Sequence, residues 1–245
     1  VLAVVILIIK ASSLFRPSSA GKERIEAAVG ISKGKSRVDL SDSDLVLRVL
    51  GLIVEHQQIP LPSQAVMYKS AQSEVKRFMV ARGFTYSSPV PMVVVPSHIL
   101  QMVGSGVQAF FLTGSRIIVL SPSAGRVYTI HEIFHSQGAF NDRIFNEGMA
   151  EYLSVLLSLF KNRRRYTTYL EFFSSRDNSS DYAGFEMLTI CFLANIIGEE
   201  VLMQAYFSKD EKIIERSLGK RVWAALRKLS DKYTNAQLFT AEGDQ

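Results

Sequence analysis

The stretch His131-Glu132-Ile133-Phe134-His135 places two histidines four residues apart, with a glutamate directly after the first. On an α-helix, residues four apart lie on the same face, so these two imidazoles can bind one metal ion together. The pattern is H-E-x-x-H, for which zinc is the usual metal. Because Ile130, Ile133 and Phe134 make the helix apolar, we expect it to be buried beneath a site and not to form a polar surface stripe.

Glu132 determines the chemistry that this motif predicts. Zinc lowers the pKa of a bound water to about 7, and a carboxylate beside that water can accept its proton while the oxygen attacks a carbonyl. This is the chemistry of metal-assisted peptide hydrolysis. The sequence therefore predicts Zn(II) as cofactor, His131 and His135 as metal ligands, and Glu132 as general base.

A catalytic zinc site needs a third protein ligand and one open position. The next predicted helix contains Asn146-Glu147-Gly148-Met149-Ala150-Glu151-Tyr152. With the H-E-x-x-H motif, this segment resembles the gluzincin metallopeptidases, the clan of thermolysin-like and aminopeptidase N-like enzymes. The resemblance implies that Glu147 is the third zinc ligand and that Glu151, one turn further on, supports a zinc-bound histidine and fixes the His131 tautomer. The other interpretation of Glu151 is a solvated charge on the helix.

The spacing between the motif and Glu147 departs from the family pattern. Eleven residues separate His135 from Glu147, fewer than in the familiar gluzincins, but enough to connect two neighbouring helices. The competing pattern is that of the metzincins, H-E-x-x-H-x-x-G-x-x-H. Gly138 occupies its glycine position, but Asn141 stands where the third histidine belongs, and Asp142 is one residue out of register. We therefore favour Glu147 over Asp142 as the third ligand.

The segment from Tyr182 to Gly198 resembles a helix of the aminopeptidase N relatives. The resemblance implies that Tyr182 stabilises the tetrahedral oxyanion; the alternative is an ordinary tyrosine at a helix start. The predicted hairpin at 109–121 lies where gluzincins place the sheet edge that pairs with an extended substrate. The G-x-M-E-N signature is absent from the sequence, so aminopeptidase activity is not implied.

Hydrophobic patterning predicts an α+β fold. Strands are expected at 92–95, 109–113 and 116–121, the last two joined as a tight hairpin. Helices are expected at 45–56, 72–82, 127–139, 146–161, 181–197, 199–207, 212–218 and 222–233. We expect a zincin-like metallopeptidase domain with a small, mostly antiparallel sheet over the H-E-x-x-H helix, followed by a C-terminal helical lobe.

The N-terminal region has a different character. Residues 1–9 are nine consecutive apolar residues, too few to span a bilayer, which takes about 20. The chain starts with Val and not Met, which suggests a fragment. We interpret residues 1–15 as the end of a signal or anchor helix or as a buried strand. The predicted organisation is this apolar segment with a basic linker (1–40), a helical preamble (41–90) and a catalytic domain (91–240).

Composition limits the classes of function. The chain has 245 residues, of which 47% are apolar and 21% charged, which argues against disorder and against an all-membrane protein. The only cysteine, Cys191, excludes an internal disulfide and a thiolate metal cluster, and we expect it to be a small buried apolar residue. His56, at a helix end, and His98, in a loop after Pro96, lack ligand spacing.

The leading hypothesis is thus a zinc metallopeptidase with a peptide or protein substrate. The N-terminal apolar segment suggests a membrane-associated or secreted protein. The alternative is a catalytically silent, peptidase-like binding or scaffold protein at a membrane, and the intact Glu132 counts against it. A nucleic-acid partner is not expected, because the net charge of +5 is small and the basic stretch at 10–40, rich in Ser and Gly, is typical of a solvated linker.

Overall fold

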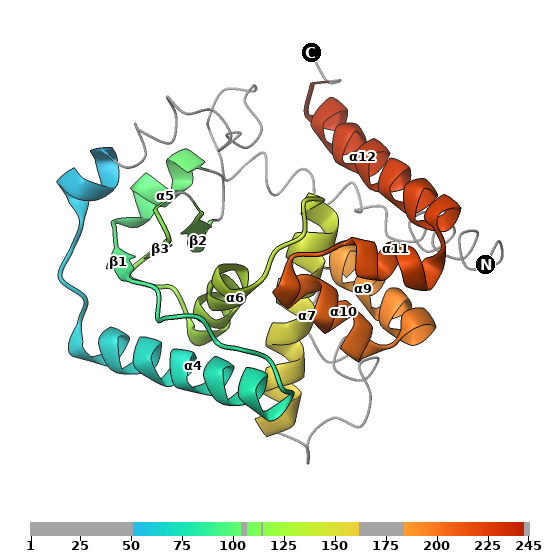
Figure 1. Cartoon of the computed structure of the whole chain (residues 1–245). Helices are drawn as coiled ribbons and strands as arrows, with labels where there is room; N and C mark the ends of the chain where they lie inside the picture. Colours follow the sequence, from blue (N-terminus) through green and yellow to red (C-terminus); the bar gives the residue numbers. More distant parts are fainter. Residues whose placement is uncertain (1–50, 104–106, 114, 162–183, 243–245) are drawn as a thin grey trace.

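The computed structural model describes residues 51–103, 107–113, 115–161 and 184–242. Residues 51–56 are helical and precede the main elements (Figure 1). In chain order these are α4 (Pro62–Ala81), β1 (Met92–Val94), α5 (Ser97–Val103), β2 (Ala109–Leu112), β3 (Ile117–Leu120), α6 (Arg126–Gln137), α7 (Arg143–Lys161), α9 (Gly184–Ile197), α10 (Glu199–Ser208), α11 (Lys212–Leu218) and α12 (Lys220–Glu242). The fold is α+β and mostly helical, as the sequence predicted.

The sheet has the strand order β1-β3-β2 and is mixed. β2 and β3 pair antiparallel as the predicted hairpin, but β1 and β3 run parallel, with Met92 opposite Ile118. The prediction of a mostly antiparallel sheet was therefore wrong for one of the two pairings. β3 can run parallel to β1 because α5 and β2 lie between them in the chain and provide a long enough connection. The local sequence pattern does not reveal such a connection.

The central strand β3 separates two clusters of apolar side chains. Successive side chains on a strand point to opposite faces. Accordingly, Ile118 and Leu120 join the main core with α4, α6 and α7, whereas Val119 joins a second cluster with Ile99 and Leu100 of α5. Both faces of this strand are thus buried, which explains its uninterrupted apolar sequence.

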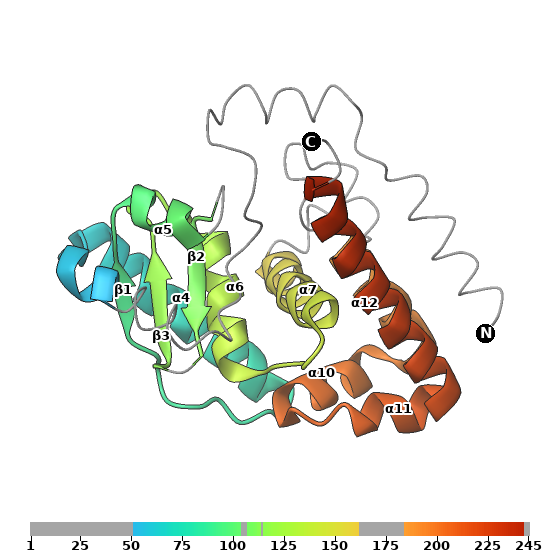
Figure 2. The same ribbon diagram turned by 90° about the horizontal axis from the view of Figure 1, so that it is seen from above.

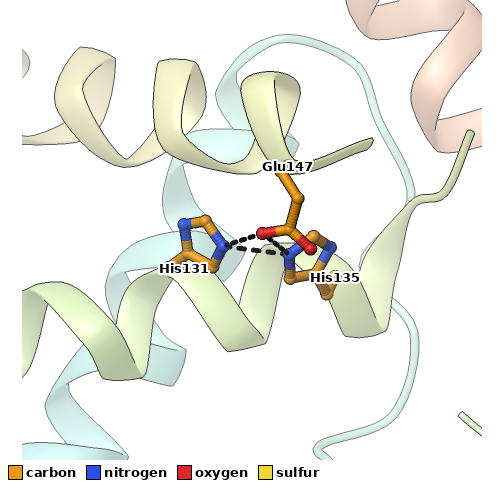
Figure 3. Close-up of side chains that lie close together, drawn as sticks. All are labelled: His131, His135 and Glu147. Atoms are coloured by element: carbon orange, nitrogen blue, oxygen red, sulfur yellow. Dashed lines mark hydrogen bonds and ion pairs between the residues drawn. The ribbon is translucent and has the colours of Figure 1, made fainter. Parts of the chain in front are cut away.

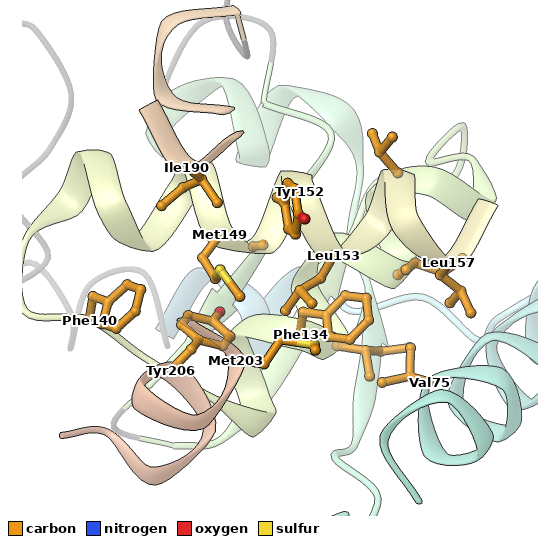
Figure 4. Packing of buried hydrophobic residues seen from close by; sticks show 14 of the residues in the cluster. Val75, Phe134, Phe140, Met149, Tyr152, Leu153, Leu157, Ile190, Met203 and Tyr206 are labelled. Carbon is orange, nitrogen blue, oxygen red and sulfur yellow. The ribbon is translucent and has the colours of Figure 1, made fainter. Parts of the chain in front are cut away.

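The motif helix α6 lies between the sheet and the helical lobe. Figure 2 shows the succession of sheet, α6 and α7, with α10, α11 and α12 beyond. On its other side α6 packs against α4, where the rings of Phe78 and Phe134 meet edge to face at 5.7 Å. Met149, Leu153, Ile190 and other side chains continue this core through α7 and α9 (Figure 4). α6 is therefore held on several sides at once.

The helix starts differ most from the sequence prediction. α4 begins ten residues earlier than the predicted position 72, because Pro62 initiates the helix and does not break it. The Leu61 N–H, which would otherwise lack a partner, donates to Gln64 Oε1 at 2.9 Å. His98 lies in α5 and not in a loop, and α12 extends beyond both predicted ends.

Residues 1–50 and 162–183 lie outside the described residues. The predicted N-terminal apolar segment, the basic linker and Tyr182 all fall within these ranges. Among the helices that the structure does describe, none combines the length and apolarity needed to cross a membrane.

Candidate metal centre

His131 and His135 lie on one face of α6, turned towards α7 (Figure 3). Their Nε2 atoms are 2.9 Å apart, and the ring planes meet at 72°. Two lone pairs facing each other at this distance would repel, so a proton or a cation between the two nitrogens is needed to stabilise this approach. A cation at the same place would satisfy both lone pairs.

Glu147, from α7, completes a triangle of ligand atoms. Its Oε2 lies 3.3 Å from His131 Nε2 and 3.6 Å from His135 Nε2. In a tetrahedral zinc site with bonds of about 2.0–2.1 Å, neighbouring ligand atoms are about 3.3 Å apart. The three observed separations lie on either side of this value, so these atoms are placed to hold one small cation.

The cluster is open on one side. The Glu147 side chain keeps 41% of its surface exposed, whereas that of His131 keeps 16% and that of His135 keeps 9%. A cation held by the two imidazoles and this carboxylate would therefore have room for a water or a substrate atom. An open fourth position is what distinguishes a catalytic zinc site from a structural one.

The distal nitrogens of both imidazoles also have partners. Glu151 is buried, and its Oε2 lies 3.3 Å from His131 Nδ1. The Asn146 amide lies 3.2 Å from His135 Nδ1, and its oxygen accepts the Phe140 N–H at 3.0 Å. A carboxylate that accepts the Nδ1–H orients a metal-binding histidine and raises its basicity, as Glu151 can do for His131. The group of Asn146 that faces His135 is the amide nitrogen, which only donates, so it can orient the ring but does not raise its basicity. Sequence reasoning missed Asn146, although its place directly before Glu147 was a usable signal.

Glu132 lies between the two histidines in sequence and is directed towards the sheet. Its side chain is buried, and the Phe111 N–H of strand β2 donates a hydrogen bond to its carboxylate. Burial raises the pKa of Glu132, and the nearby imidazoles offset only part of this rise. An upward shift brings a carboxylate closer to the pKa that a general base needs near neutral pH.

His131 and Glu147 shift each other's pKa in opposite directions. Burial alone would lower the pKa of His131, but hydrogen bonds to the Glu147 and Glu151 carboxylates raise it well above its ordinary value. Burial alone would raise the pKa of Glu147, but the two imidazoles hold it well below its ordinary range. Both shifts favour the charged forms, so the attraction between His131 and Glu147 is that of an ion pair.

Asp142, the alternative candidate for the third metal ligand, has a structural role instead. Its Oδ1 accepts hydrogen bonds from the Ile144 N–H at 2.9 Å, the Phe145 N–H at 3.3 Å and the Ser230 hydroxyl at 2.6 Å. It therefore caps α7 and ties that helix to α12. Among the described residues, the structure brings Glu147, and not Asp142, to the two histidines.

Cys191 is partly buried in α9, and burial raises the pKa of its thiol to about 11. A thiol with this pKa is protonated at neutral pH and is a poor nucleophile. The expected unreactive thiol agrees with this environment, although Cys191 is partly and not fully buried.

No protein-family model, curated protein or solved structure matches the chain.

Zinc affinity is expected to fall about tenfold for each pH unit below the raised pKa of His131, because zinc must displace the proton held there. Without zinc, protonated His131 stabilises the folded protein, and this stabilisation is complete below about pH 6.5, the ordinary histidine pKa. The stabilisation is lost as pH rises through the raised pKa of His131 in the folded state. Zinc titration against a competing chelator between about pH 6 and 8 measures the first effect. An affinity independent of pH over this interval would contradict the coupling.

Proposed function

We propose that this protein is a zinc-dependent metallopeptidase of gluzincin type that hydrolyses peptide bonds in a peptide or protein substrate. The observation that carries the proposal is the convergence of His131 Nε2, His135 Nε2 and Glu147 Oε2 on one point, with Glu132 between the two histidines in the same helix. Under this proposal the fold is a zincin-like domain, with α6 as its active-site helix.

The proposed site residues have two roles: some bind the metal, and one transfers a proton. A zinc ion bound by His131, His135 and Glu147 would supply a Lewis acid and lower the pKa of a coordinated water to about 7. Glu132 takes the proton of the attacking water and later delivers it to the leaving amine. Its hydrogen bond from the Phe111 N–H holds the carboxylate in place during these transfers.

Strand β2 suggests how a peptide would reach this site. It is one of the two edge strands of the described sheet and packs beside α6. An extended peptide can add to a sheet edge through main-chain hydrogen bonds, which suits recognition of a peptide backbone of varied sequence. The proposal assigns this role to β2 and oxyanion stabilisation to Tyr182, which lies outside the described residues.

Zinc content of the purified chain and of two variants tests the metal site. We expect one zinc per chain in wild type and in Asp142→Asn, and loss of zinc in Glu147→Ala. Asp142→Asn is the matched control, because Asn removes the competing carboxylate yet still caps a helix well. Loss of zinc in Asp142→Asn alone would instead assign the third ligand to Asp142.

A peptide-library cleavage assay on the zinc-loaded wild type tests the reaction. Cleavage that stops on chelation and returns with zinc is the expected result. Zinc binding without cleavage of any peptide would favour the alternative of a silent, peptidase-like binding protein. A wild type that binds no zinc would overturn the proposal.

A further inference from the structure

Tyr206, on α10, carries a buried hydroxyl that needs a partner. The side chain has no exposed surface, and among the described residues its hydroxyl has no hydrogen-bond partner. A buried donor left unpaired costs free energy, so each such group in a native fold calls for an explanation. Tyr86 is the other tyrosine of the described residues in this situation.

The ring of Tyr206 is locked against the end of the motif helix. A methyl group at Gly138, the residue that follows α6, would collide with the ring and would lie only 2.9 Å from the Tyr206 carbonyl oxygen. That carbonyl accepts the Ala139 N–H at 3.1 Å, and the ring of Phe140 packs on that of Tyr206 at 5.2 Å. Gly138 is therefore required for close approach and not for an unusual backbone, since its φ is −137°.

The hydroxyl points from this position towards α7, the helix that carries Glu147 (Figure 4). Burial, and to a smaller extent the negative charges of Glu147 and Glu132, raise the pKa of Tyr206 well above its ordinary value. The group thus remains a neutral phenol with a proton to donate. Its lack of exposed surface means that it cannot touch a substrate.

We propose that the Tyr206 hydroxyl is a positioning group of the metal centre, which donates a hydrogen bond to the Glu147 carboxylate, directly or through one water, when zinc is bound. This inference rests on the proposed zinc site. A carboxylate that binds zinc through one oxygen leaves the second oxygen in need of a donor, and such outer partners orient the ligand. Tyr206 comes from α10, so it would couple the helical lobe to the metal.

Tyr206→Phe and Tyr86→Phe form a matched pair for the test. Each removes one buried, unpartnered hydroxyl and keeps the ring, but burial alone raises the pKa of Tyr86, with no carboxylate acting on it. The zinc dissociation constant is measured on the full chain by chelator competition. The visible spectrum of the Co(II)-substituted protein and the melting temperature of the metal-free protein are recorded alongside.

We expect Tyr206→Phe to weaken zinc binding about 10- to 100-fold and to alter the Co(II) spectrum. The metal-free melting temperature should not fall, and Tyr86→Phe should bind zinc as wild type does. Wild-type zinc affinity and spectrum in Tyr206→Phe would overturn this role while leaving the metal site intact. A loss of affinity of equal size in Tyr86→Phe would also overturn it, and absence of zinc from wild type would remove both proposals together.

Discussion

Glu132→Gln is expected to lower kcat/KM for peptide cleavage about 10²- to 10⁴-fold while zinc content stays at the wild-type level. Glutamine has the size and shape of glutamate, and its carbonyl oxygen can still accept the Phe111 N–H. It cannot take a proton from water. The substitution therefore removes the base and preserves the packing of a side chain that is 8% exposed.

The pH dependence of kcat/KM is a second test of Glu132 as general base. In wild type, kcat/KM should rise as Glu132 loses its proton, with an apparent pKa above the ordinary glutamate value because burial raises it. This acidic limb should disappear from the residual activity of Glu132→Gln. A profile unchanged by the substitution would show that another group titrates there.

Asp142→Asn is the control for this experiment as well. Asp142 is also 8% exposed and also loses its charge, but it caps α7 and does not face the two histidines. We expect its activity to stay within a few-fold of wild type, since the cap is kept. A Glu132→Gln protein that loses zinc, or that cleaves as fast as this control, would contradict the assignment of Glu132 as base.

Gly148→Ala is expected to destabilise the metal-free protein by about 1–3 kcal/mol and to weaken zinc binding. In an ordinary helix interior, this change stabilises by about 1 kcal/mol. Here a methyl group would collide with the Glu186 carbonyl oxygen, and it would lie 2.7 Å from that carbonyl carbon and 2.9 Å from Ile190 Cγ1. Because backbone atoms of α9 stand in the way, α7 and α9 must separate, which moves Glu147.

Gly125→Ala provides the comparison. A methyl group at Gly125 would meet no atom within 4 Å, and the φ of −79° suits alanine. Gly125 is the N-cap of α6, where alanine is less favourable than glycine, so the free energy of unfolding of Gly125→Ala, from urea denaturation, should fall by no more than about 1 kcal/mol. A Gly148→Ala protein more stable than wild type would show that helix propensity dominates and that α9 does not constrain the ligand helix.

The local sequence pattern predicted a helix or strand well where the hydrophobic repeat and both ends of the element lay in one continuous stretch of sequence. The boundaries of α11 (Lys212–Leu218) agree with the prediction to the residue, and β2 and β3 agree to within one or two residues. The early start of α4 was missed because a proline between two segments can end one or begin the next. The short helix α5 was missed because Pro96 and the few residues after it do not show a helical period.

Part of the candidate site could likewise be predicted from local sequence, and part could not. The sequence by itself determined that His131, Glu132 and His135 belong together, because a helix repeat of 3.6 residues sets the face on which each lies. It also supplied both Glu147 and Asp142 as further ligands, which it ranked only by resemblance.

The tertiary structure alone decided which carboxylate reaches the imidazoles, which groups stand behind them, and that β1 runs parallel to β3. These features depend on how segments distant in the chain pack together. Gly148 beneath Glu186 allows α7 to approach α9 closely, and Gly138 beneath Tyr206 allows the end of α6 to approach α10. Contacts between such distant residues follow from the packing of the whole core, which no local pattern of residues encodes.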